Sequence, residues 1–232
     1  MCNKNNSSSK VDKNFEEVIE ILKLNKINYW LCHGTLLGII RDNNLIPWDH
    51  DVDIAVWQDI ELKKKFMIIM RENNYRLKQK YFINDDLLTF VKDGGREIDI
   101  NFYERKLKNG KEIAFVKWCV PKNFLMKFIE AISQASYYSG KGKFFIKRLI
   151  FLEKIFEKIK KMLIVKGLFY RFIGYTQPYE LLKQFKEIKF HNILVNVPFK
   201  HDEYLSYVYG SDWKKQKKKF NWITDSPSTE QV

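Results

Sequence analysis

Three aspartates in two apolar segments are the residues of this sequence best suited to chemistry. Asp51 and Asp53 lie in DVDIAVW, residues 51–57, and Asp99 lies in EIDINFY, residues 97–103. Successive side chains of a strand point to opposite faces, so each segment predicts one apolar face and one face that carries acids. If the two strands are neighbours, the three carboxylates converge.

Converging carboxylates predict a divalent metal, because like charges at close range disfavour joint ionisation. Mg²⁺, or Mn²⁺ in its place, takes oxygen ligands and keeps positions for water and substrate phosphates. Such ions can clamp the attacking and leaving oxygens of a phosphoryl displacement. We predict Asp51 and Asp53 as catalytic metal ligands, and Asp99 as a third ligand or as the base that accepts a hydroxyl proton. The alternative is an acidic solvent face on an edge strand.

A turn and a short helix precede the first acidic strand and supply candidate substrate-binding residues. Gly34 and Thr35 are expected to let the backbone approach donor phosphates, unless they form a plain strand-to-helix turn. Arg41 is a candidate for bidentate phosphate binding or, alternatively, a surface residue at a helix end. Trp48 could wall a donor pocket, or pack in the loop. Asp49 is expected to support the ligands or to be a simple loop acid.

The glycine–threonine turn, the D-x-D strand and the later strand aspartate together resemble the signature of the nucleotidyltransferase-fold superfamily. More narrowly, HGTLLGIIRDNNLIPWDHDVDI, residues 33–54, resembles the LicD family, which includes bacterial phosphocholine transferases and the fukutin-related proteins. VNVPFKHDEYLSYVYGSDW, residues 195–213, resembles a later pattern of that family. His50 departs from the family pattern, because the family commonly has a third consecutive acid at this position.

The resemblance implies a mixed α/β (α+β) sheet with a nucleotidyltransferase-like core, and a metal-dependent phosphotransferase. The transferred group would be phosphocholine, or a similar group such as a phosphopolyol, and the donor CDP-linked, with CDP-choline expected. The acceptor would be a sugar hydroxyl of a surface glycan such as lipopolysaccharide or teichoic acid. Two rival functions are a nucleotidyltransferase that uses an NTP on RNA or a small molecule, and a non-catalytic basic binding module.

A choline-bearing donor would require an aromatic cage, because aromatic faces hold a quaternary ammonium. The candidates near the acids in sequence are Tyr29, Trp30, Trp57, Tyr103 and Trp118. Aromatics make up 16% of the chain, so core packing is the favoured explanation for any one of them.

The elements that must position these residues follow from periodicity and turn signals. We expect strands at 28–34, 51–57, 87–93, 96–104, 112–118 and, as two short strands, 187–199. Helices are expected at 12–25, 35–40, 59–72, 122–175 (mostly) and 179–185, and at the start of 201–213, where a stop follows the helix. Hairpins are expected at Gly94-Gly95 and Asn109-Gly110. Mixed helices and hairpins indicate an α+β or α/β fold.

This order of elements predicts one interrupted domain. The expected parts are a frayed tail (1–14), a catalytic core (15–121), a basic helical insertion (122–175), a C-terminal part that completes the core (176–222) and a second frayed tail (223–232).

The net charge of +13 is concentrated in two segments of the chain. Residues 141–171 hold ten Lys/Arg against two Glu, and KKQKKK, residues 214–219, adds five lysines, which leaves the remainder neutral. An apolar stripe in the first segment predicts either a core-facing helix with a basic outer face or a helix on an anionic membrane. The stripe comprises Phe145, Leu149, Leu152, Phe156, Ile159 and Leu163.

A lipid-linked glycan acceptor would suit peripheral membrane association. Nucleic acid is the less favoured partner, because the basic character does not extend through the catalytic part and no nucleic-acid-binding motif is recognised. Three scattered cysteines, with neither a signal-peptide pattern nor a membrane-spanning run, favour the cytoplasm or the inner face of the membrane.

Overall fold

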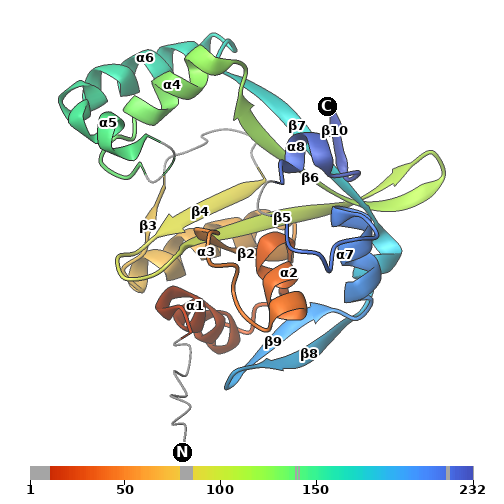
Figure 1. Cartoon of the computed structure of the whole chain (residues 1–232). Helices are drawn as coiled ribbons and strands as arrows, with labels where there is room; N and C mark the ends of the chain where they lie inside the picture. The colour runs from red at the N-terminus through yellow and green to blue at the C-terminus, as the bar shows by residue number, and fades with distance from the viewer. Residues whose placement is uncertain (1–10, 79–85, 139, 141, 218–219, 232) are drawn as a thin grey trace, which may run out of the picture. The chain divides into compact units, whose positions relative to one another are not determined.

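The computed structural model describes residues 11–78, 86–138, 140, 142–217 and 220–231 (Figure 1). The expected N-terminal tail therefore lies largely outside the described residues. The chain divides into two compact units. We call the unit formed by residues 1–117 and 174–230 the sheet unit. We call the unit formed by residues 118–173 and 231–232 the helical unit. The predicted mixed α/β class is confirmed, with a sheet and helices alternating along the chain.

An eight-stranded sheet has the order β1-β2-β5-β6-β7-β10, with β4 beside β5 and β3 beside β4. β2 and β5 are parallel, whereas β1, β4 and β6 run antiparallel to their partners in this group. The strands are β1 (Trp30–Leu31), β2 (Asp51–Trp57), β3 (Arg76–Leu77), β4 (Leu87–Val91), β5 (Glu97–Lys108), β6 (Lys111–Pro121), β7 (Tyr170–Pro178) and β10 (Thr229–Gln231).

The predicted alternation along β2 and β5 is confirmed. Val52 and Ile54 are fully buried, while the acids of the same strand are half-buried on the opposite face. Helix α3 (Ile60–Glu72) covers the apolar face, where the rings of Phe66 and Phe102 pack edge to face with their centroids 5.9 Å apart. One face of β2 and β5 is therefore buried against α3, and the opposite face carries the half-buried acids.

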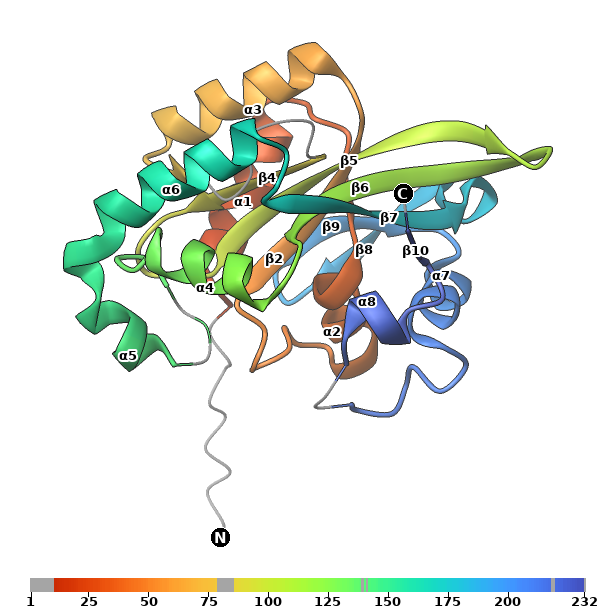
Figure 2. The same cartoon turned by 90° about the horizontal axis from the view of Figure 1, so that it is seen from above.

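Helix α2 (His33–Asp42) lies on the other face of the same two strands, opposite α3 (Figure 2). Two bonds fix its first turn to β2: the Asp53 N–H donates to Thr35 Oγ1 at 2.7 Å, and the Cys32 N–H donates to the Asp53 carbonyl at 3.2 Å. Gly38 allows the following loop to pack on the helix, since a Cβ there would lie 2.6 Å from the Asn44 carbonyl oxygen. The start of α2 is thus held directly over the acidic face.

Both predicted hairpins are confirmed. Gly94 has a φ of 98° between β4 and β5, and Asn109 and Gly110 have φ values of 50° and 73° between β5 and β6. Positive φ at both central residues of a two-residue turn matches the right-handed twist of the strands. The remaining elements of the sheet unit are α1 (Lys13–Leu24), the 3₁₀ helix η2 (Tyr179–Leu182), β8 (Phe185–Phe190), β9 (Ile193–Pro198), α7 (His201–Tyr209) and α8 (Trp222–Asp225).

Four segments differ from their predicted structure. Residues 170–175 begin β7 instead of continuing a helix, and 179–185 form one 3₁₀ turn before β8. The strand expected at 28–34 has two paired residues, because His33 already begins α2. Near the C-terminus, where we expected a frayed tail, α8 and β10 are formed. Short segments of mixed pattern depend on tertiary pairing, which local periodicity does not encode.

The helical unit consists of α4 (Phe124–Ile132), α5 (Lys143–Arg148), the 3₁₀ helix η1 (Ile150–Leu152) and α6 (Glu153–Val165). Its small core contains Ala131, Ile132, Ala135 and Ile146. Three residues of the predicted stripe, Leu149, Leu152 and Phe156, pack against this core, so packing explains that part of the stripe. Over the ranges described, no helix is both long enough and apolar enough to cross a membrane.

Candidate active site

The acidic face of β2 carries a compact group of carboxylates. Asp49, Asp51 and Asp53 are half-buried, and one carboxylate oxygen of each lies within 4.8 Å of the others. Three oxygen donors at this separation could hold a metal ion, and a hard cation such as Mg²⁺ prefers oxygen ligands.

Asp99 is the neighbour of Asp53 in the parallel register of β2 and β5. Both side chains belong to the acidic face, so the two predicted strands do meet there. Glu97 is the register partner of Asp51, but its two carboxylate oxygens bind Lys78 Nζ at 2.5 and 2.6 Å. The ion pair neutralises Glu97, and Asp99 remains the acid of β5 nearest to the group on β2.

The start of α2 points at Asp53. Asp53 Oδ2 accepts from the backbone N–H of Gly34 at 3.1 Å and of Thr35 at 3.4 Å. The first N–H groups of a helix have no partner within the helix and carry a partial positive charge. The turn therefore orients one oxygen of Asp53, and it stabilises negative charge at the site.

Asp53 nevertheless experiences strong repulsion. Burial raises the pKa of Asp53 well above its usual value, and the charges of Asp51, Asp49 and Asp99 raise it further, in that order, while the Thr35 N–H opposes them. Burial, followed by the charges of Asp53, Asp99 and Asp51, also raises the pKa of the Cys32 thiol. A cation among the carboxylates would remove this repulsion, so the electrostatics and the donor set both fit a metal.

An acid closely approaches Gly34. A Cβ at this position would overlap Asp49 Oδ2 and lie 3.6 Å from Asp53 Oδ2. The glycine therefore leaves room for the carboxylate group beside the helix start, a role that differs from the predicted approach to donor phosphates. It also explains how Asp49, expected only as a supporting or loop acid, comes to lie among the other two.

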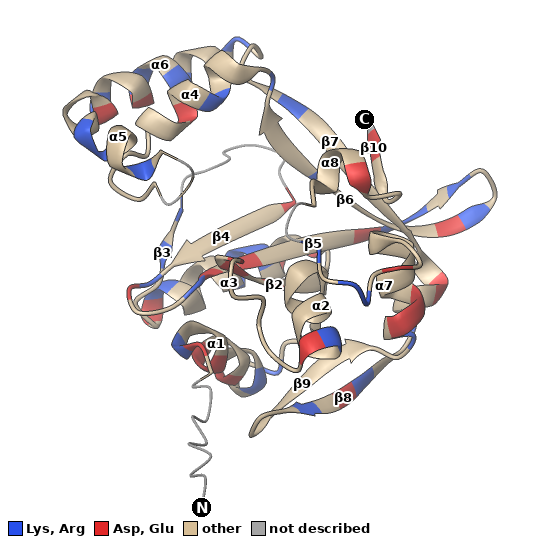
Figure 3. Cartoon of the chain, in the orientation of Figure 1, with Lys and Arg blue, Asp and Glu red and all other residues tan. Residues whose placement is uncertain are grey.

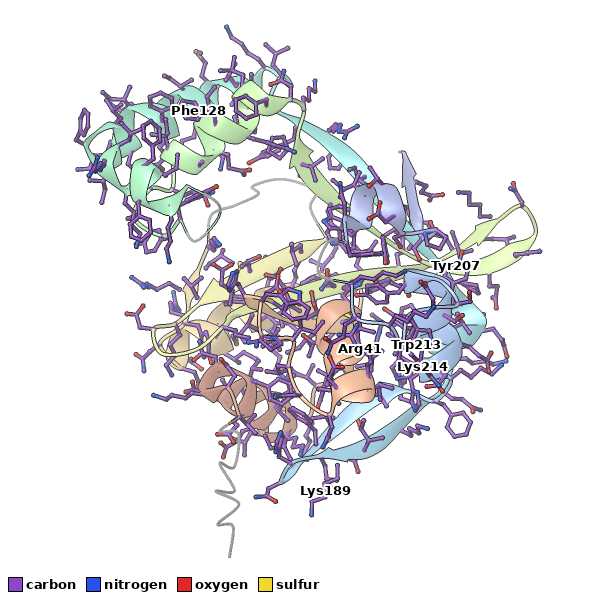
Figure 4. The ribbon with its side chains drawn as sticks, in the orientation of Figure 1. Arg41, Phe128, Lys189, Tyr207, Trp213 and Lys214 are labelled. Carbon is purple, nitrogen blue, oxygen red and sulfur yellow. The ribbon has the colours of Figure 1, made fainter. Side chains whose placement is uncertain are left out.

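Arg41 binds an acid of its own helix. Its Nε and Nη2 donate to the two carboxylate oxygens of Asp42 at 3.0 and 2.7 Å, and its side chain is 6% exposed. Gln216 Nε2 also donates to Asp42, at 3.3 Å, which brings the C-terminal segment to this end of α2. Figure 4 marks Arg41 close to Trp213 and Lys214. Trp48, the other predicted substrate-binding residue, is 42% exposed in the loop before β2.

Aromatic residues pack against His33, the first residue of α2; of these, the sequence patterns had indicated only Tyr103, as a candidate for a choline cage. His33 Nε2 is 3.2 Å from the Tyr103 hydroxyl, and its ring packs edge to face on Tyr175 at 5.2 Å. Burial lowers the pKa of His33 to about 4, so the ring is neutral at physiological pH. These contacts fix the entry of the chain into α2 without adding charge.

Tyr209 is a further aromatic residue close to the acids. Its pKa is raised well above the usual value, by burial first and then by Tyr175, Asp53, Tyr204 and Asp49. Tyr209 is the tyrosine of the YG pair within residues 195–213, so that motif was the signal by which it could have been found. Tyr209 of the C-terminal motif therefore lies close enough to Asp53 and Asp49 for their charges to act on it.

A pocket of about 560 Å³ lies at the opposite end of β2 from Asp51. Its aromatic residues include Trp57, Tyr103 and Tyr179, and the Arg105 guanidinium lies 4.2 Å from the Tyr179 ring centroid. Two predicted cage candidates therefore line this pocket. Trp30 is 1% exposed and packs against Trp57 at 5.1 Å, as a core residue.

Comparison with known proteins agrees with the family suggested by the motifs. Residues 26–130 match the family described as LicD/FKTN/FKRP, nucleotidyltransferase domain. We call this stretch the LicD-family segment, after the family that it matches. The matched residues include the start of α2, the group of Asp49, Asp51 and Asp53, and Asp99, so the LicD-family segment contains all of these carboxylates.

Relatives of the LicD-family segment include characterised transferases. An uncharacterised protein of Rickettsia typhi is 31% identical over 88 residues, which are 38% of this chain and 26% of that protein. The ribitol 5-phosphate transferase FKRP of Homo sapiens is 42% identical over 40 residues, 17% of this chain and 8% of FKRP. The human ribitol-5-phosphate transferase FKTN is 28% identical over 99 residues, 40% of this chain and 21% of FKTN. The matches span about a quarter or less of these relatives.

Among solved structures, the lincosamide antibiotic adenylyltransferase LnuA with bound lincomycin superposes with a TM-score of 0.36 and 12% identity, over 62% of this chain and 98% of LnuA. The antibiotic-resistance factor ANT(2'')-Ia gives a TM-score of 0.32 at 10% identity, over 66% and 90%. These scores are too low to support an argument, so the fold assignment rests on the sheet topology and the family match.

Proposed function

We propose that this LicD-family chain is a metal-dependent transferase that moves a phosphate-linked group from a CDP-activated donor to a sugar hydroxyl of a glycan. The observation that carries the proposal is the carboxylate group of Asp49, Asp51 and Asp53 at the start of α2. Acids gathered by a helix start, in a segment related to two phosphate transferases, favour phosphoryl transfer over a plain acidic surface.

In this proposal, Asp51 and Asp53 hold Mg²⁺ or Mn²⁺, and Asp49 contributes the third oxygen ligand. When bound, the metal supplies charge neutralisation for the donor phosphates. Asp99 accepts the proton of the attacking sugar hydroxyl, or completes the ligand set, from its place beside Asp53. Thr35 and the N–H groups of the first turn orient Asp53.

The transferred group is proposed to be a phosphopolyol or phosphocholine. The ribitol-phosphate transferases among the relatives favour the polyol. The family resemblance of residues 33–54 includes phosphocholine transferases, which makes phosphocholine the second candidate. A lipid-linked glycan such as a precursor of lipopolysaccharide or teichoic acid would bring the enzyme to the inner face of a membrane.

The test is to incubate the purified chain with Mg²⁺ and, separately, CDP-ribitol, CDP-glycerol and CDP-choline, and to measure CMP release with and without glycan acceptors. We expect acceptor-dependent CMP release from one donor, abolished by EDTA and by Asp53→Asn. The exposed acid Asp93, on the β4–β5 hairpin, supplies the matched control Asp93→Asn, which should retain activity.

Two results would contradict the proposal. Pyrophosphate release from CTP or ATP, with no CMP from any CDP-linked donor, would assign nucleotidyl transfer instead. Metal affinity and glycan modification that survive Asp53→Asn unchanged would show that the acids are a solvent-facing surface.

A further inference from the structure

The helical unit exposes large apolar side chains that its core does not use. Phe124, Phe144, Phe151 and Val165 are 83%, 79%, 72% and 85% exposed. By contrast, Ile132 and Ala135 of the core are 1% and 0% exposed. Scattered exposed apolar residues are ordinary, but this many large ones in one small unit mark an interaction surface.

Two of these phenylalanines share a face with basic residues. Phe144, Lys147, Arg148 and Phe151 are spaced i, i+3, i+4 and i+7, and all four are exposed. Backbone bonds from Leu149 N to Ile146 O and from Leu152 N to Leu149 O, both 2.9 Å, continue the helical turns across the junction of α5 and η1. The spacing therefore places the two aromatic rings on the same side as the two positive charges.

α6 repeats this combination. Its outward residues are Lys154, Ile155, Lys158, Lys161, Met162 and Val165, every one of them exposed. Apolar and basic side chains are thus mixed along one face of α6. Figure 3 shows more blue (Lys, Arg) than red (Asp, Glu) residues on α5 and α6. Long lysine side chains can keep their charges in water while their alkyl stems lie along an apolar surface.

We propose that this face of α5, η1 and α6 docks on an anionic lipid bilayer, with Phe144 and Phe151 inserted at the headgroup–acyl boundary. The described residues 142–171 contain nine Lys/Arg and two Glu. Lys160 is buried and pairs with Glu130, but the other eight basic side chains are exposed, so the surface charge is complementary to anionic headgroups. Phenylalanine and valine offer no hydrogen bonds to a polar partner, whereas the acyl boundary accepts them. The biological purpose rests on the proposed function, because docking would bring the enzyme to a lipid-linked acceptor.

The test is co-sedimentation of the full chain with vesicles of phosphatidylcholine alone and of phosphatidylcholine mixed with phosphatidylglycerol. We expect binding to the mixed vesicles only, weakened by high salt. Phe144→Ser/Phe151→Ser should weaken it at least about tenfold, because binding scales with buried apolar area. Lys147→Gln/Arg148→Gln should weaken it about 30-fold, the equivalent of ~1 kcal/mol per charge.

The matched control is Leu107→Ser, which removes an apolar side chain that is 74% exposed on the β5–β6 hairpin of the sheet unit. This variant should bind vesicles as the unchanged chain does. The melting temperature of the double phenylalanine variant should not fall, because its two side chains are exposed; this separates lost binding from lost folding.

Vesicle binding that is equal in the unchanged chain and the double phenylalanine variant would overturn the proposal, since charge alone would then suffice. Concentration-dependent dimers that the same substitutions abolish, without vesicle binding, would assign the face to a second copy and also overturn it. Binding to single-stranded RNA in place of vesicles would do the same. Asp53→Asn should bind vesicles normally, so failure of the transferase proposal and failure of the docking proposal are separable.

Discussion

Charged and apolar residues occupy opposite places in the two units. In the sheet unit, β2 and β5 bury valine, isoleucine and phenylalanine completely, and turn their acids toward the start of α2. In the helical unit, a core of four small or medium residues leaves large phenylalanines exposed beside lysines. The sheet unit thus concentrates negative charge at a half-buried site, whereas the helical unit spreads positive charge over an exposed surface that a partner can contact.

The comparison teaches that charge must be read together with burial. Burial, and then the charges of the neighbouring acids, raise the pKa of Asp53, so its ionised form makes the metal-free sheet unit less stable. A bound cation would offset this cost. The exposed lysines of the helical unit have no such cost, because water solvates them. Strain within a site points to chemistry, while an exposed mixture of charge and apolar surface points to docking.

The largest expected effect comes from removing the charge at the centre of the site. Asp53→Asn should reduce CMP release at least about 1000-fold, or ~4 kcal/mol, because it removes a proposed metal ligand. The same substitution should raise the melting temperature in EDTA, because it removes a repelled buried charge. Activity assays and thermal melts of one preparation measure both. A loss of activity with a large loss of stability would instead indicate a structural role.

The same carboxylate makes stability depend on pH. Its folded-state pKa is raised, so its contribution to the metal-free protein is fully present below the unfolded-state pKa and is lost as the pH rises through the folded-state pKa. Mg²⁺ binds the ionised form, so its stabilising effect should grow over the same interval. Thermal melts with EDTA and with Mg²⁺ at several pH values should therefore diverge toward neutral pH, and parallel curves would contradict a metal at Asp53.

The buried ring of His33 should produce a second pH effect of opposite sign. Burial lowers its pKa from 6.5 to about 4, so stability is lost as the pH falls from 6.5 toward 4, by at most about 3 kcal/mol. His33→Gln should reduce this slope in the free energy of unfolding. His201→Gln, on α7, is the matched control and should retain it. An unchanged slope in His33→Gln would show that the ring is not a source of acid sensitivity.

The contrast between core and surface in the helical unit can be measured directly. Ile132→Ala removes a buried side chain and should cost about 2 to 4 kcal/mol, whereas Phe151→Ser removes an exposed one and should cost less than about 0.5 kcal/mol. Limited proteolysis within residues 118–173 reports the stability of this unit. Equal protease sensitivity of the two variants would show that Phe151 is covered in the folded chain.

The smallest expected effect sharpens the role of the first turn of α2. Gly34→Ala should displace the Asp49 carboxylate and weaken metal binding about tenfold, ~1.4 kcal/mol, with little loss of stability because a side chain can yield. Gly38→Ala meets backbone instead and should lower the melting temperature more than metal affinity. If Gly34→Ala and Asp49→Asn together weaken binding no more than either alone, the two act through one ligand.

Much of the site was predictable because strand alternation is a local property. The period of two placed Asp51, Asp53 and Asp99 on polar faces before any contact was known, and the helix over 201–209 and both hairpins followed from equally local signals. Arg41 shows the limit, because the prediction of a phosphate-binding arginine did not include its bidentate pairing with Asp42.

By itself the sequence determined the two acid-bearing strands, the LicD-type motifs and the two basic segments, since each depends on spacing along the chain. The tertiary structure decided which acids meet. The parallel register brought Asp99 beside Asp53, and the absent Cβ of Gly34 made room for Asp49. It also decided which apolar residues of the basic segment form core and which remain exposed. Burial depends on partners far along the chain, whereas periodicity predicts only which residues share one face of a helix.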